Sequence, residues 1–442
     1  MSRLFQAQRA MRRKRQAALA RGVVAILDVG TFNTTCLVLR FEQNTPTGEG
    51  VGQMAGQSNV RVIGAATTQA RGMRLGEVDT MPEVERAIRT VVQAAQKMAG
   101  LRVDHVIASF SGGRPESIAL QGEASLRDGP CDVHDVAHVL ASIDTPDLGE
   151  GREAMHAQPV NFGIDHRTQL RDPRGQTGEA LSADLHLLSV DAHAIENLLT
   201  CLHRCDLECA GLASAPYAAA TAVLVEDEKE LGAACIDMGA GTTGVTIFAR
   251  RHMIYSSTVR MGGDHVTADI SQGLRVPHDV AERIKCRFGG VHATGQDDRE
   301  RIALEAETGD WHHDRRSVTR TELIGIVRPR LEEVLEAARI RLDEAGFDHL
   351  PGQRIVLTGG ASHIPGLDGL ATRILGNQVR LGRPMRVQGL PEMAKGPSFA
   401  ACVGLCMHAA APQDEFWDFD AVGPRDAGRP VKRALRWFAE NW

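Results

Sequence analysis

The chain has 442 residues, enough for two or three domains with buried cores, and its 43% hydrophobic and 24% charged residues are ordinary for a globular protein. No apolar run approaches the roughly 18 residues of a membrane-spanning helix. The start of the chain lacks the apolar core of a secretory signal, so we expect a cytoplasmic protein. The net charge of −6 is unevenly distributed: residues 1–22 carry +7, residues 429–442 carry +3 and the rest carries −16. This pattern favours contact with an anionic surface through the ends and argues against nucleic acid as a partner, because nucleic-acid binders gather basic residues on the folded domain.

The first part of the chain predicts a basic arm followed by alternating strands and helices. Residues 1–22 match no motif, and we expect them to be disordered. Residues 23–27 are an apolar run typical of a buried strand, and residues 82–99 have the apolar spacing of a helix that ends at Gly100. Residues 105–190 mix short strands with polar loops, and residues 191–205 predict another helix.

An internal repeat is the most informative feature of the chain. Residues 26–38 and 235–247 both run from an apolar strand through Asp-x-Gly-x-x-x-Thr into a second strand of alternating apolar residues. A hairpin that recurs after so long an interval predicts two similar domains that face each other.

The turn of each repeated hairpin suits a polyphosphate. Glycine lets backbone N–H groups approach an anion closely, and threonine hydroxyls add donors. An aspartate at the end of each first strand can hold Mg²⁺ through water. An ordinary tight turn is the alternative for one hairpin, but two hairpins in register favour a nucleotide. The predicted ligands are Asp28, Gly30, Thr31 and Thr34 in the first copy and Asp237, Gly239, Gly241, Thr242 and Thr243 in the second, with Asp28 and Asp237 holding the metal.

A third glycine cluster follows the predicted long helix at residues 323–338. Residues 355–358 read as a buried strand that opens into a small-residue turn containing Gly359 and Gly360. Taken alone this is an ordinary turn, but beside two phosphate hairpins it indicates a site where a flat adenine lies against the backbone.

The end of the chain predicts a membrane-binding helix. Residues 411–428 contain two prolines and five acidic residues and read as a flexible acidic linker. In residues 429–442 the apolar side chains fall on one helical face, with cations beside it, as in an interfacial helix on anionic lipids. The alternative is a terminal helix packed on the protein's own core. The predicted membrane contacts are Val431, Lys432, Arg433, Leu435, Arg436, Phe438 and Trp442.

Two phosphate hairpins and an adenosine turn resemble the actin, Hsp70 and sugar-kinase superfamily. Within it, the segments 211–214, 226–232, 262–270 and 281–285 are similar to those of the FtsA family of cell-division proteins. The resemblance implies an acid and a lysine near the ribose and adenine, which we place at Glu282 and Lys285. An exposed helical i, i+3 pair is the alternative for these two.

The resemblance also implies the architecture. We expect an α/β fold of two actin-like (ribonuclease H-like) lobes, with the extra subdomain of the FtsA family inserted in the first lobe. The expected first lobe comprises residues 23–104 and 191–232, with the inserted subdomain at 105–190. The expected second lobe comprises residues 233–410 and contains a smaller subdomain at about 286–345.

Two departures from the superfamily bear on hydrolysis. Phe32 and Asn33 stand where actin-like proteins often place a lysine for the phosphates. Ala215 precedes Pro216 where related ATPases carry a glutamate that places the attacking water, and a methyl group cannot accept a proton. We expect ATP and Mg²⁺ binding with weak or no hydrolysis.

The function implied by the resemblance is assembly at the division septum, on the cytoplasmic face of the bacterial inner membrane. The protein would polymerise with itself, anchor FtsZ filaments to anionic lipids and recruit later divisome proteins. The C-terminal peptide of FtsZ would bind at Arg315, Arg316, Arg320 and Glu322, for which a solvated charge run is the alternative. The alternative functions are an actin-like scaffold of pilus assembly and a small-molecule kinase of the same superfamily.

Overall fold

The computed structural model describes residues 3–41, 60–127, 129–144, 146–304, 317–376, 378–385 and 387–419. These residues form two compact units. The larger contains the described residues up to Ala119, together with Asp147–Gln158 and His186–Gln413, and the smaller contains Leu120–Pro146, Pro159–Leu185 and the described residues from Asp414 onward. No helix among the described residues is both long and apolar enough to cross a membrane.

The first lobe of the larger unit is built on a five-stranded sheet. Its strands β1, β2 and β3 are antiparallel, whereas β6 runs parallel to β1 and β11 runs parallel to β6. The helices α2 (Met81–Ala99) and α4 (Ala192–Arg204) pack against each other and against strands of this sheet. In spatial order the strands are β11 (Glu208–Ser214), β6 (His105–Phe110), β1 (Val23–Val29), β2 (Asn33–Phe41) and β3 (Val60–Gln69). The short hairpin β4 (Met73–Arg74) and β5 (Glu77–Val78) lies between β3 and α2 in the chain.

The second lobe repeats this pattern. Its β12 pairs antiparallel with β13 and parallel with β17, just as β1 pairs with β2 and β6. The predicted duplication is therefore confirmed at the level of strand pairing. In spatial order the strands are β14 (His252–Val259), β13 (Thr243–Ala249), β12 (Ala233–Met238), β17 (Arg354–Thr358) and β18 (Val379–Leu381).

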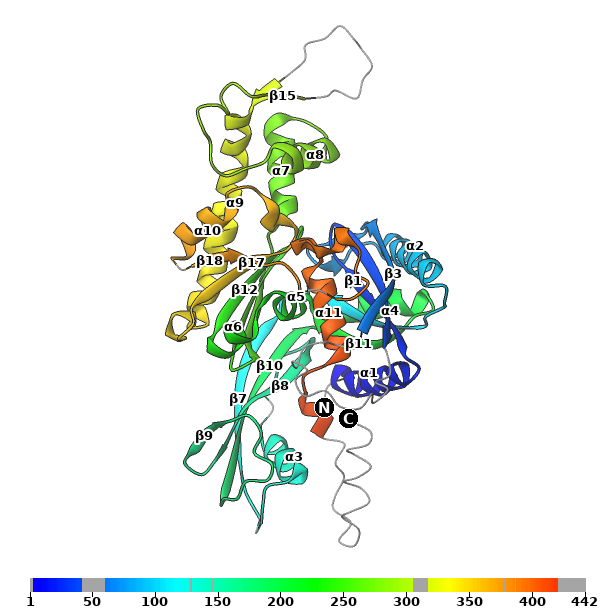
Figure 1. Cartoon of the computed structure of the whole chain (residues 1–442), viewed down its shortest axis with the longest axis vertical. Helices are drawn as coiled ribbons and strands as arrows, with labels where there is room; N and C mark the ends of the chain where they lie inside the picture. Colours follow the sequence, from blue (N-terminus) through cyan, green and yellow to red (C-terminus); the bar gives the residue numbers. More distant parts are fainter. Residues whose placement is uncertain are drawn as a thin grey trace, which may run out of the picture. The chain divides into compact units, whose positions relative to one another are not determined.

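Two apolar helices, α5 (Ala215–Val223) and α11 (Ala400–Ala410), lie between the two sheets (Figure 1). They pack on each other in a core that joins Ile26 and Leu39 of the first sheet to Phe248 and Val356 of the second. Because α11 also contacts β1 and β6, the predicted second lobe of residues 233–410 ends too late: residues 400–410 return to the first lobe.

The longest helix of the described second lobe is α9 (Arg320–Glu344). The helices α7 (Gly263–Leu274) and α8 (His278–Phe288) pack on α9 through a shared apolar core, so the smaller subdomain begins earlier than the predicted residue 286. The remaining elements are α6 (Glu226–Leu231), α10 (Leu367–Leu375), and the two-stranded pair β15 (Arg301–Ala303) and β16 (Ser317–Thr319). Among the described residues, 3-10 helices span Phe347–His349, Gly360–His363, Glu392–Lys395 and Pro397–Phe399.

The smaller unit is built from the strands β7, β8, β9 and β10 and from α3 (Val133–Ala141). A capping box formed by Asp132 and Asp135 fixes the start of α3, and Val139 and Leu140 bury its apolar face. The predicted insertion begins too early at residue 105, because β6 belongs to the first sheet. The strands are β7 (Glu116–Ser125), β8 (Arg152–Ile164), β9 (Arg167–Leu170) and β10 (Ala180–Asp191), and parts of β7, β8 and β10 continue into the larger unit.

The prediction that residues 1–22 are disordered is wrong for the part that the structure describes, residues 3–22. Residues Arg3–Ala20 form the helix α1, which packs mainly on β11 and buries Leu4, Met11 and Ala18. These side chains share one helical face, and a short cationic helix that is marginal by itself is stabilised when that face is buried.

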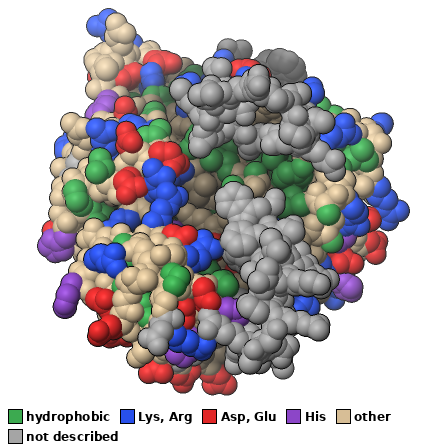
Figure 2. All heavy atoms as spheres, turned by 60° about the horizontal axis from the view of Figure 1, so that its bottom comes forward, with side chains coloured by type: hydrophobic (Ala, Val, Ile, Leu, Met, Phe, Trp, Pro, Cys, Tyr) green, Lys and Arg blue, Asp and Glu red, His purple; other side chains and the backbone are tan. Residues whose placement is uncertain are grey.

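The predicted linker also begins with ordered structure. The helix α12 (Phe416–Phe419) packs two aromatic side chains on the core of the smaller unit. Residues 420–428 of the predicted linker, the whole predicted membrane helix 429–442, and Arg315 and Arg316 lie outside the described residues. Basic and acidic side chains are interspersed on the face drawn in Figure 2.

Candidate functional site

The two repeated hairpins make the same turn. The backbone N–H of Gly30 donates to the carbonyl of Asn33 at 3.0 Å, and that of Gly239 donates to the carbonyl of Thr242 at 2.9 Å. A Cβ on either glycine would lie 3.0 Å from the same carbonyl oxygen, so both positions favour glycine for the same steric reason.

The tips of the two hairpins approach each other closely. A Cβ at Gly241 would lie 2.5 Å from the Thr31 hydroxyl oxygen and 3.1 Å from Cα of Leu75. The Thr31 hydroxyl is held in place because it accepts a hydrogen bond from the Gly76 N–H at 3.2 Å. Gly241 therefore allows the second lobe to meet the first above the cavity.

The two aspartates at the ends of β1 and β12 face the same cavity. Burial raises the pKa of Asp28, although a hydrogen bond from the Ser109 hydroxyl at 2.5 Å opposes that rise. Burial also raises the pKa of Asp237 to about 7, and the negative charge of Asp28 adds to the shift. Two carboxylates that repel each other in a buried site favour a bound cation, which would lower both pKa values.

The predicted adenosine turn contacts the second hairpin directly. Gly359 has a φ of +85°, and a Cβ there would lie 2.5 Å from both the Asp237 carboxylate and the carbonyl of Met238. Only glycine fits such a position, because the side-chain clash adds to an unfavourable backbone conformation. The turn thus brings β17 against the end of β12.

Glu282 and Lys285 are not an exposed helical pair. Their side chains are only 19% and 10% exposed and form an ion pair of 2.6 Å. The Lys285 ammonium also donates to the carbonyl of Gly263 and to the Thr267 hydroxyl, which donates to Glu282. Burial raises the pKa of Glu282, but the charge of Lys285 and the hydrogen bonds from Lys285, Thr267 and Cys286 together outweigh it, and the pKa lies below its usual value. This network fixes α8 on α7 beside the cavity.

These elements enclose one cavity of about 400 Å³. Most of the predicted nucleotide residues line it, but Thr34 and Thr243 do not: both are buried, and the Thr243 hydroxyl donates to the carbonyl of Met261. Thr34 and Thr243 lie one strand position beyond the turn. Because successive side chains of a strand point to opposite sides, their hydroxyls point away from the cavity. The lining residues that were predicted are Asp28, Gly30, Thr31, Asp237, Gly239, Gly241, Thr242, Glu282, Lys285, Gly359 and Gly360.

Several residues that line the cavity were not predicted from the sequence. Ser111 reaches the cavity from the segment after β6, His363 ends the 3-10 helix that begins at Gly360, and Ser398 and Phe399 belong to the 3-10 helix Pro397–Phe399. Ala215 was noted only for what it lacks; it lines the cavity at the start of α5, together with Pro216.

Known proteins resemble this chain along most of its length. The family model described as cell division protein FtsA matches residues 234–404, and the model of the SHS2 domain inserted in FtsA matches residues 112–189. The cell division protein FtsA of Rhizobium meliloti (strain 1021) is 37% identical over 386 residues, with 87% of each chain covered. That of Agrobacterium fabrum (strain C58) is 36% identical over 425 residues, with 95% of each chain covered.

The chain belongs to the FtsA family. The more distant FtsA of Escherichia coli (strain K12) is 27% identical over 398 residues, covering 88% of this chain and 90% of the relative. The match at residues 112–189 confirms the inserted subdomain of this FtsA-family chain and places its start after β6.

Solved structures support the actin-like α/β fold. A chain of the PilM–PilN type IV pilus biogenesis complex superposes with a TM-score of 0.59 at 15% identity, covering 88% of this chain and 99% of that chain. The crystal structure of MreB5 of Spiroplasma citri bound to ADP superposes with a TM-score of 0.51 at 12% identity, covering 87% and 95%. At these identities the likeness concerns the fold alone.

The two described members of the predicted FtsZ site have structural roles. Arg320 pairs with Asp297 at 3.2 Å and donates to the carbonyl of Phe288. Glu322 accepts from the N–H of Thr319 and caps α9. Both side chains are therefore committed to local contacts, and a partner would compete with those contacts.

Proposed function

We propose that the chain is an ATP-binding, actin-like cell-division protein that anchors FtsZ filaments at the cytoplasmic face of the inner membrane. The nucleotide part of the proposal rests on one observation: two Asp-x-Gly turns with the same backbone hydrogen bond meet the Gly359 turn at one cavity. Membership of the FtsA family supports the cell-division part.

The residues present fit magnesium and ATP. The backbone N–H groups of the two glycine turns would hold the phosphates, and Asp28 and Asp237 would hold Mg²⁺ through water. Glu282 and Lys285 would contact the ribose side of the nucleotide. Bound Mg²⁺ would neutralise phosphate charge, which matters here because no lysine stands in the first hairpin turn.

Hydrolysis is expected to be weak. In the cavity wall at the start of α5, Ala215 offers a methyl group where an acceptor for the attacking water would stand. The nucleotide would then act as a ligand that holds the two lobes together, and the bound state would polymerise.

The last fourteen residues would attach the polymer to the membrane. Burial of Leu435, Phe438 and Trp442 gives modest attachment per chain, and polymerisation multiplies it through effective concentration. FtsZ would bind near the start of α9, including Arg315 and Arg316, and later divisome proteins would join at the septum.

Co-sedimentation with anionic vesicles and FtsZ, with and without ATP, tests this function. We expect FtsZ to sediment with vesicles only when the protein is present, and more strongly with ATP. Phe438→Glu should release the protein from vesicles, because it places a charge on the apolar face. Ala421→Glu makes the same charge change in the linker and should have no effect.

A separate double variant tests the proposed FtsZ-binding site. Arg315→Glu combined with Arg316→Glu should weaken binding of the FtsZ C-terminal peptide while ATP affinity, measured by calorimetry, stays unchanged. Wild-type peptide affinity in this variant would move the docking site elsewhere.

A further inference from the structure

The helix α1 presents a cationic outer face. Its inner face is fixed by Leu4, Met11 and Ala18, and by a buried hydrogen bond from the Gln8 amide to the carbonyl of Met155 at 3.0 Å. At 100° per residue, Arg13 lies half a turn away from this inner face, and it is exposed. The segment 3–21 contains seven basic residues and no acidic ones.

A second cation stands on a constrained turn. The two-residue loop between β13 and β14 consists of Arg250 and Arg251, with φ of +52° and +71°. Such a turn normally selects Asn-Gly, because a side chain at positive φ is unfavourable by roughly 1 kcal/mol or more.

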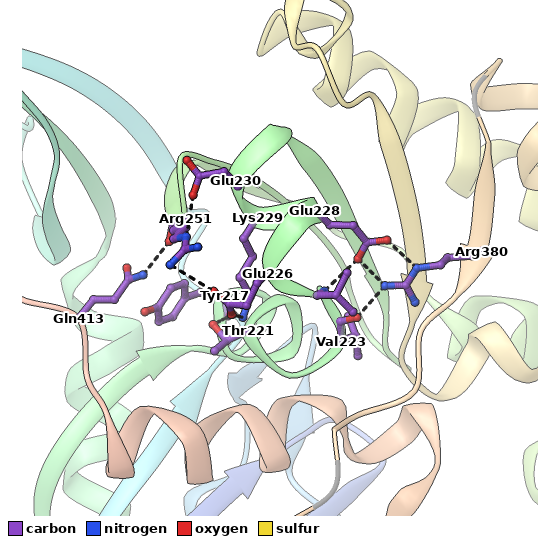
Figure 3. Close-up of polar contacts among 11 residues, drawn as sticks. Tyr217, Thr221, Val223, Glu226, Glu228, Lys229, Glu230, Arg251, Arg380 and Gln413 are labelled. Carbon is purple, nitrogen blue, oxygen red and sulfur yellow. Dashed lines mark hydrogen bonds and ion pairs between the residues drawn. The ribbon is translucent and has the colours of Figure 1, made fainter. Parts of the chain in front are cut away.

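Contacts with α6 hold this turn in place. The backbone N–H groups of Arg250 and Arg251 donate to the carbonyls of Glu230 and Lys229. The guanidinium of Arg251 pairs with Glu230 at 2.6 Å (Figure 3). The Arg250 side chain is exposed, and no ion pair with another described residue is assigned to it. Arg251 therefore stabilises the turn, and Arg250 is left at its tip.

Both cationic elements contact one short stretch of chain. A guanidinium nitrogen of Arg15, on α1, lies 3.4 Å from Nε2 of His408. The Gln413 side-chain amide donates to the carbonyl of Arg251 at 2.9 Å. Residues 408–413 span about 18 Å at most, and the same chain continues toward residues 429–442.

We infer that the outer face of α1 and the Arg250 tip form a second contact with anionic lipid headgroups. This inference rests on the proposed function, in which the last fourteen residues bind the bilayer. Once those residues bind, the surface around residues 408–413 is held at high effective concentration near the headgroups.

A lipid surface fits these cations better than an acidic peptide does. The arginines come from two separate elements, Arg13 from α1 and Arg250 from the turn between β13 and β14. A planar array of mobile headgroups can meet discrete cations without a groove. Each arginine near an anionic leaflet contributes about 1 kcal/mol, or about fivefold in affinity.

The test uses the full-length protein and vesicles with or without phosphatidylglycerol. Arg13→Gln or Arg250→Gln should each weaken binding to anionic vesicles about fivefold, and the double variant about 25-fold. Binding to zwitterionic vesicles, which depends on apolar burial alone, should not change. Arg299→Gln, which removes another exposed arginine in the turn before β15, is the matched control and should bind within about twofold of wild type.

The outcomes separate this inference from the proposed function. If Phe438→Glu keeps wild-type vesicle binding, the terminal helix is not the anchor and the proposed function fails. If Phe438→Glu loses binding but the double variant does not, the second contact is absent. An equal loss with Arg299→Gln would indicate a nonspecific charge effect, and a loss of FtsZ-peptide binding with unchanged vesicle binding would assign these arginines to a protein partner. Each of these last three results would overturn the inference.

Discussion

The two repeated hairpins make the same backbone turn but carry different residues at their tips. The first carries Phe32, which is 41% exposed, and the second carries Gly241 at the same place in the repeat. Phe32 lines the cavity and is partly exposed, whereas a Cβ at Gly241 would strike Thr31 of the other lobe. The duplication thus preserved the two turns for which we propose phosphate binding, and only the second tip needs a residue without a side chain, because it meets Thr31 of the first.

The largest expected effect on nucleotide affinity comes from adding a side chain at the tip of the second hairpin. Gly241→Val should weaken Mg-ATP binding about 100-fold or more, because the new side chain pushes the lobes apart above the cavity. Phe32→Val places the same side chain at the equivalent position of the first hairpin and should keep affinity within about threefold. Calorimetry measures both, and equal losses in the two variants would show that the tips are equivalent.

The buried side chain of His186 lies outside the two hairpins and offers a separate test, of folding stability instead of nucleotide binding. Burial, with a smaller effect from His156, lowers the pKa of His186 to about 3, below its usual 6.5. Its Nε2 lies 3.0 Å from the Ser117 hydroxyl, which in turn bonds the backbone of Ser256 on β14.

This histidine makes stability depend on pH. Because the unfolded chain binds its proton near pH 6.5 and the folded chain does not, folding free energy is retained above pH 6.5 and lost as pH falls toward 3. The expected loss from His186 is about 2 kcal/mol between pH 7.5 and pH 5. Urea unfolding at both values measures it, and His186→Gln should reduce the difference. A pH response that is unchanged in this variant would contradict the assignment.

The two aspartates allow the hairpins to be compared through their effect on metal binding. Asp28→Asn and Asp237→Asn should each reduce the enhancement of ATP affinity by Mg²⁺ about tenfold, because each removes one charged partner of the ion. Titration of ATP at several magnesium concentrations gives this enhancement directly. If one variant keeps the full enhancement, that hairpin does not take part in metal binding.

The smallest effect concerns the missing lysine. Phe32→Lys should tighten ATP binding about twofold to fivefold, since the tip is partly exposed and solvent screens the new charge. Phe32→Gln, of similar length and without charge, is the control. Tighter binding in both variants would point to removal of the aromatic ring instead of an added charge.

Short-range patterns predicted much of the fold and most of the cavity. The two hairpins, the Gly359 turn and α2 were all identified because each depends on neighbouring residues: glycines in turns and apolar spacing along one element. Thr34 and Thr243 were misplaced because one strand position decides which way a side chain points.

The sequence by itself determined the repeated turns, the strands that carry them and the asymmetry of charge, since those properties are local or additive. Only the tertiary structure decided that α1 is ordered, that α11 returns to the first lobe and that Arg15 and Gln413 bring two cationic elements to one segment. These results depend on contacts between residues hundreds of positions apart. A helix such as α1 is too weak to persist by itself, and the surface that stabilises it exists only after the chain has folded.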